Sequence, residues 1–134
     1  MRTHLEFNST LFEEPEGVGN TYNPDIQGAK LADFLSREFK ALGYSGAIIE
    51  EDWGWMIDLG GEQFPTWLGC ASYSSPNGWL VFIEPSEPFV RKWLKKIDTQ
   101  PAVTRIAEQL ETLLTTKGGA TRLNWWSDQD SGRK

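Results

Sequence analysis

The spacing of apolar residues changes twice along this chain of 134 residues. Residues 31–42 repeat apolar side chains at the helical period, residues 47–59 repeat them at the strand period of two, and residues 103–114 return to the helical period. A segment patterned for one period does not bury its apolar side chains in the other structure. The pattern predicts an α+β fold, a two-layer sandwich in which two main helices cover a mainly antiparallel sheet, in the order β-α-β-β-β-β-α-β.

The first part of the chain predicts a strand and a helix joined by an acidic loop. Residues 3–8 alternate like a strand, and residues 11–22 are rich in Glu and Gly. Asn23, followed by proline and aspartate, is a typical helix N-cap, so a helix is predicted over residues 24–42.

The central part predicts a meander of strands. Residues 47–59 form a strand or a strand pair, in which Trp53, Trp55, Ile57 and Leu59 share one face by their spacing of two. Two glycines turn the chain into a return strand at residues 62–73, and a second turn leads to residues 79–83, which are apolar on both faces and indicate a central strand.

The last part predicts two helices and a strand. Residues 87–97 match a short amphipathic helix, and a longer helix opens at Asp98 or Thr99, with Leu110 fully buried and Glu111 facing water. Residues 120–126 return as a strand. The domain organisation expected is therefore one α+β domain over residues 1–126 and a flexible polar tail over residues 127–134.

The net charge of −6 is unevenly distributed. Residues 1–87 hold 14 acids and 4 bases, whereas residues 88–134 hold 5 acids and 9 bases. An acidic majority disfavours nucleic acid and favours a basic protein partner, although solubility alone would also explain the charge. With one cysteine, no signal-peptide pattern and no run of 18 apolar residues, we expect a cytoplasmic protein without a membrane association.

Residues for catalysis and for metal binding are scarce. His4 is the only histidine and Cys70 the only cysteine, which leaves too few groups for a catalytic triad or a structural zinc site. The glycines match neither a dinucleotide fingerprint nor a phosphate-binding loop. Cys70 is interpreted as a small buried side chain. We therefore expect no catalytic residue, no metal and no cofactor.

Tryptophans beside carboxylates form the candidate binding residues. Glu51, Asp52, Trp53 and Trp55 follow one another closely, and Trp125 and Trp126 are adjacent in the last strand, where neighbours point to opposite faces. Such rings either fill a core or form a recognition surface. One basic stretch could bind a phosphate or an acidic surface. The alternative is that its cations simply lie in water on one face of a helix. The stretch consists of Arg91, Lys92, Lys95 and Lys96.

The sequence Glu51-Asp52-Trp53-Gly54-Trp55, together with Gly78-Trp79-Leu80-Val81-Phe82-Ile83-Glu84, resembles a group of small uncharacterised bacterial α+β proteins. The resemblance implies a bacterial single-domain protein and assigns no functional residue.

Three functions are open. The first is a non-enzymatic protein-interaction domain, such as an acidic immunity or inhibitor protein of a basic partner. The second is a small-ligand module or weakly marked enzyme with a tryptophan-lined cleft, and the third is a structural subunit or homodimer.

Overall fold

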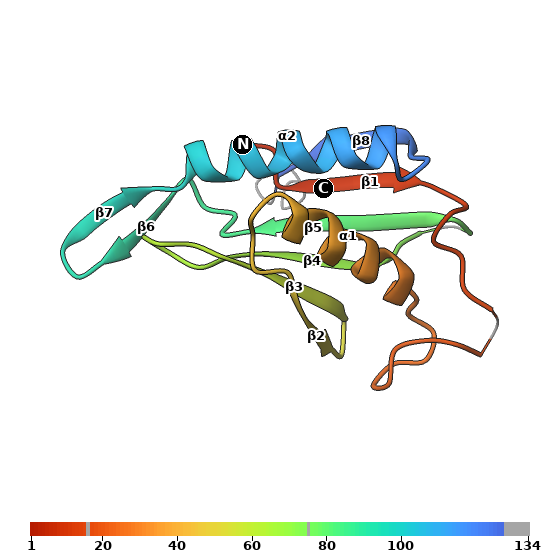
Figure 1. Cartoon of the computed structure of the whole chain (residues 1–134). Coiled ribbons are helices and arrows are strands. Elements are labelled where there is room, and N and C mark those ends of the chain that lie inside the picture. The colour runs from red at the N-terminus through yellow and green to blue at the C-terminus, as the bar shows by residue number, and fades with distance from the viewer. Residues whose placement is uncertain (16, 75, 128–134) are drawn as a thin grey trace.

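The computed structural model describes residues 1–15, 17–74 and 76–127 (Figure 1). Its helices are α1 (Ala29–Ala41) and α2 (Gln100–Thr116). Its strands are β1 (His4–Asn8), β2 (Ala47–Glu51), β3 (Gly54–Gly60), β4 (Thr66–Ser72), β5 (Gly78–Glu84), β6 (Phe89–Lys92), β7 (Lys95–Asp98) and β8 (Thr121–Trp126). Of the predicted tail, residues 128–134 lie outside the described residues, and Ser127 is buried.

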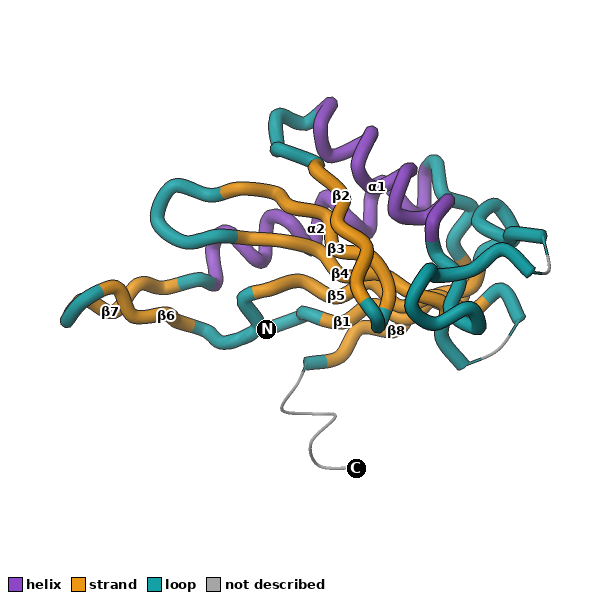
Figure 2. Tube along the Cα trace, turned by 90° about the horizontal axis from the view of Figure 1, so that it is seen from below, coloured by secondary structure: helices purple, strands orange, loops and turns teal. Residues whose placement is uncertain are grey.

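Six strands form one antiparallel sheet in the order β2-β3-β4-β5-β1-β8. The meander from β2 to β5 is continuous, and β1 then pairs with both β5 and β8, with Leu5 opposite Val81 on one side and Trp125 on the other. Both helices lie on the same face of this sheet, as Figures 1 and 2 show. The predicted α+β two-layer class and its element order are confirmed. Within the described residues, neither helix has the length and apolar character needed to cross a membrane.

The core lies between the helices and one face of the sheet. Alternate residues of the strands, among them Leu5, Ile57 and Val81, are fully buried against Leu35 of α1 and Leu110 of α2. Burial of such side chains is the main favourable term in folding. The predicted stripe of α2 and the burial of Leu110 are therefore confirmed, and among the described residues no helix lies over the opposite face of the sheet.

The helix predicted over residues 87–97 is wrong, because this segment forms the hairpin of β6 and β7. Thr99 donates its backbone N–H to the carbonyl of Pro88 at 3.0 Å and its hydroxyl to the carbonyl of Glu87. The two ends of the segment are thus held together, whereas a helix of this length would place them about 15 Å apart. Only a chain that turns back on itself satisfies both hydrogen bonds.

Helix α1 begins at Ala29, five residues later than predicted. Asn20 holds the preceding segment in a turn, since its side-chain oxygen accepts the N–H groups of Tyr22 and Asn23 and its amide donates to the carbonyls of Glu51 and Gly54. Asn23 therefore does not cap the helix. Glu14 caps the first turn in part, because its Oε1 accepts the N–H of Lys30 at 2.8 Å.

Candidate functional site

The face of the sheet opposite the helices, here called the open face, carries a continuous row of aromatic rings. This aromatic band consists of Trp53, Trp67, Phe82, His4 and Trp126. Neighbouring ring centroids along it are 6.0, 5.7, 5.6 and 4.1 Å apart. His4 is 8% exposed and is stacked between its neighbours, while the other four rings are half-buried. Such separations are typical of favourable aromatic pairs, so the rings support one another in place.

Strand alternation places most of the aromatic band. Leu68 and Val81 point into the core, so Trp67 and Phe82 point to the other side of the sheet. Phe82 lies opposite Gly69 in the register. A Cβ atom on Gly69 would be 2.1 Å from Cζ of Phe82, which means that the ring covers the glycine directly. The glycine makes room for the ring, and the ring shields the glycine backbone.

Carboxylates surround the aromatic band. Glu6, Glu51, Asp58 and Glu84 share the open face by register and alternation. The described strands β1 to β5 contain no lysine or arginine. Glu6 accepts a hydrogen bond from Nε1 of Trp126 at 2.8 Å, which fixes that ring at the edge of the face. The open face therefore combines exposed ring surface with negative charge.

The structure divides the predicted site residues between the two faces of the sheet. Trp126 lies on the open face, Glu51 lies at its β2 edge, and Asp52 is exposed in the turn between β2 and β3. Trp53 occupies the same turn and contacts Trp67 and Phe82, so the prediction that it shares a face with Trp55 is wrong. The turn ends the alternation on which that prediction depended.

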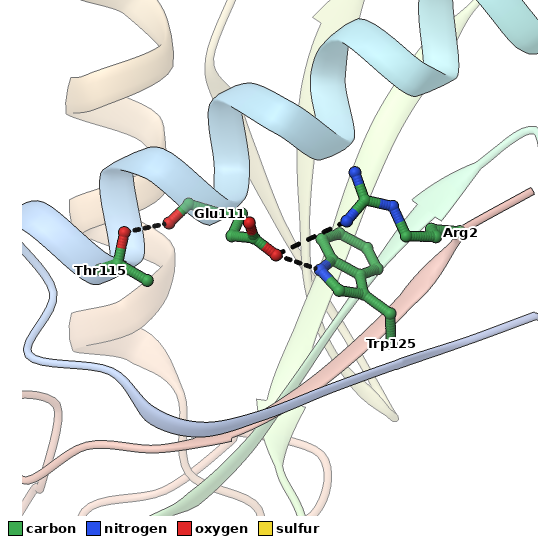
Figure 3. Close-up of polar contacts among 4 residues, drawn as sticks. All are labelled: Arg2, Glu111, Thr115 and Trp125. Atoms are coloured by element: carbon green, nitrogen blue, oxygen red, sulfur yellow. Dashed lines mark hydrogen bonds and ion pairs between the residues drawn. The ribbon is translucent and has the colours of Figure 1, made fainter.

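Trp55 and Trp125 lie on the helix side of the sheet. Trp55 is 5% exposed and belongs to the core. Nε1 of Trp125 donates to Oε1 of Glu111 on α2 at 2.7 Å, and Nη1 of Arg2 lies 3.6 Å from the same oxygen (Figure 3). The guanidinium of Arg2 also lies 4.9 Å from the centre of the Trp125 ring. This contact fastens β8 to α2, and the prediction that Glu111 simply faces water is wrong.

Several members of the open face were missed in the sequence: Trp67, Phe82, His4 and Glu6. The alternation signal for the first two was present, because Phe82 lies between Val81 and Ile83 and Trp67 lies between the buried residues Thr66 and Leu68. The position of β1 between β5 and β8 was not predictable from local pattern, and it is this position that brings His4 and Glu6 to the open face.

Cys70 faces the core and is fully buried. Its burial raises the pKa of the thiol far above the usual range, and the nearby carboxylate of Glu14 raises it further. A thiol held protonated in this way is a poor nucleophile. Within the described residues, no three His, Cys, Asp or Glu side chains gather as a metal site would require.

Comparison of the chain with protein-family models, with curated proteins and with solved structures finds no match. No functional residue is therefore assigned from a relative, and the geometry of the open face is the basis for the function of the protein.

Proposed function

We propose that this protein is a non-enzymatic interaction domain that binds a basic protein partner on the open face of its sheet. An immunity or inhibitor protein that masks a basic toxin would work in this way. The single observation that supports the proposal is the composition of the open face, where an aromatic band lies among four carboxylates, and the strands that hold these carboxylates, β1, β2, β3 and β5, contain no lysine or arginine.

The aromatic band supplies the anchors of the proposed interface. Large, rigid rings such as Trp53, Trp67 and Trp126 lose little conformational entropy when a partner covers them, and tryptophan is enriched among residues that dominate binding energy. The faces of these rings also attract arginine and lysine side chains of a partner through cation–π interactions.

The carboxylates supply attraction at a distance and selectivity. Negative charge on one face accelerates encounter with a positively charged partner and repels acidic proteins. Because Glu51 and Asp52 are at the edge of the face and not in the core, their charges can be changed without disturbing the packing.

The test begins with capture of partners from the source organism on the immobilised protein, followed by calorimetry with each purified partner. We expect a partner with a basic surface whose affinity falls as salt is added. The variant Glu51→Lys with Asp52→Lys should weaken that binding by about tenfold or more.

The matched control is Asp33→Lys with Glu108→Lys, which changes the net charge equally but on exposed positions of the helix layer. It should bind almost as tightly as the parent. If the control loses as much affinity as the open-face variant, or if the partners that are captured are acidic, the proposal is wrong.

A further inference from the structure

The hairpin of β6 and β7 projects beyond the end of the main sheet and beyond the start of α2, at the left of Figure 1 and of Figure 2. Its tip consists of Trp93 and Leu94, which are 93% and 95% exposed. They lie in the two-residue turn between Lys92 and Lys95. Two large apolar side chains fully in water at a protruding tip indicate an interaction site.

Four cations surround this apolar tip. In the hairpin register Arg91 lies opposite Lys96, and Lys92 lies opposite Lys95. Consecutive residues of a strand point to opposite faces, so one pair of cations lies on each face of the hairpin. Lys96 is held along the strand by the Phe89 ring, with its Nζ 3.9 Å from the ring centre. The apolar tip is thus ringed by positive charge on both sides.

This arrangement is unfavourable for the hairpin by itself. Like charges placed directly opposite one another in an antiparallel pair are destabilising. Trp93 also adopts a φ of 62°, in the left-handed region that glycine and asparagine favour and bulky residues avoid. An Asn-Gly turn with neutral flanks would form the same hairpin more easily. The residues of the tip are therefore explained better by a binding role than by folding.

We propose, in place of the expectation of no membrane association, that this hairpin docks the protein on an anionic lipid surface, with Trp93 and Leu94 inserted at the interface and the four cations among the headgroups. Tryptophan favours the boundary between headgroups and acyl chains, and lysine and arginine beside it are attracted to anionic lipids. Headgroups surround an inserted tip on all sides, so both cation pairs meet negative charge at once.

Other occupants fit the tip less well. The flat open face of a second copy would meet only one face of the hairpin and so only one of the two cation pairs. A convex two-residue tip also buries little area against a protein surface, compared with about 800 Å² per partner in a typical stable interface. A nucleic acid would gain from stacking on Trp93 but not from exposed Leu94.

Flotation of the full chain with vesicles tests this proposal. The parent should bind vesicles of phosphatidylcholine mixed with phosphatidylserine, should bind phosphatidylcholine alone at least about tenfold less, and should be released by salt. Replacing the tip by Trp93→Asn with Leu94→Gly should reduce binding by about tenfold or more while retaining the hairpin, because Asn-Gly is a favoured hairpin turn. Lys92→Glu with Lys95→Glu should abolish binding.

The matched control is Lys30→Glu with Lys40→Glu on α1, which changes the net charge by the same amount at exposed positions away from the hairpin. It should retain most of the binding. The proposal is overturned if the parent fails to float with the anionic vesicles, or if the Asn-Gly variant floats as well as the parent. It is also overturned if the tip instead supports a concentration-dependent dimer that the Asn-Gly variant loses.

Discussion

Gly69 and Phe82 act as one unit on the open face. The ring covers the glycine so closely that a methyl group on Gly69 would displace it. We expect Gly69→Ala to destabilise the protein by about 1–3 kcal/mol, because the ring must leave its place beside Trp53 and Trp67. Urea unfolding measures this loss. In a Phe82→Ala background the same substitution should be nearly neutral, and an equal loss in both backgrounds would contradict the contact.

The thiol of Cys70 should be chemically silent in the native protein. Because it is buried and its pKa is raised, a thiol reagent should not modify it until urea unfolds the chain. Rapid stoichiometric modification of the folded protein would show that β4 opens or is placed differently.

The same raised pKa of Cys70 predicts how stability depends on pH. The unfolded thiol releases its proton above about pH 8.5, while the native thiol keeps it. The contribution of the Cys70 thiol to the free energy of unfolding is therefore fully present below that pH and is lost as the pH rises above it. Urea midpoints measured on either side of pH 8.5 should fall more steeply for the parent than for Cys70→Ala, and parallel curves would contradict the expectation.

Two neighbouring residues of α2 test the placement of that helix. Leu110 is fully buried, so Leu110→Ala should cost about 2–5 kcal/mol. Glu111→Ala should cost roughly 1–2 kcal/mol, because it removes the acceptor of the Trp125 indole N–H at a partly exposed position. In a Trp125→Phe background, Glu111→Ala should lose most of its destabilising effect. A neutral Glu111→Ala would mean that β8 is not fastened to α2 in this way.

The helices and strands that the sequence predicted correctly are those whose environment is uniform along their length. Helix α2 buries one stripe throughout, and β5 lies inside the sheet, so the helical period of apolar residues identified the first and a continuous apolar run identified the second. The opposite orientations of Trp125 and Trp126 also followed, because alternation holds within a regular strand.

The elements that were predicted wrongly depend on contacts between residues that are distant in the sequence. The β6–β7 hairpin matched a helical period over its short length, and the contacts of Thr99 with Glu87 and Pro88 decided against the helix. The start of α1 was moved by Asn20, whose side-chain amide donates to the distant carbonyls of Glu51 and Gly54 while its oxygen accepts the N–H groups of Tyr22 and Asn23. In both cases tertiary hydrogen bonds overrode local preference.

At the scale of the whole molecule, the candidate site depends on topology more than on any motif. The aromatic band joins residues from β1, β4, β5, β8 and the turn after β2, and His4 and Trp126 reach it only because β1 lies between β5 and β8. The Glu51 to Trp55 stretch attracted attention in the sequence, yet it contributes Trp53 to the open face and Trp55 to the core. Sequence proximity and surface proximity therefore differ at this site.

Binding on the open face is tested most directly by the tryptophan indole N–H signals in a ¹H–¹⁵N NMR titration with the captured basic partner. Seven tryptophans give one such signal each. Binding on the open face should shift the signals of Trp53, Trp67 and Trp126 and leave those of the buried Trp55 and Trp79 nearly unchanged. Shifts confined to Trp125 on the helix side, or an absence of shifts at saturation, would contradict binding of the partner on the open face.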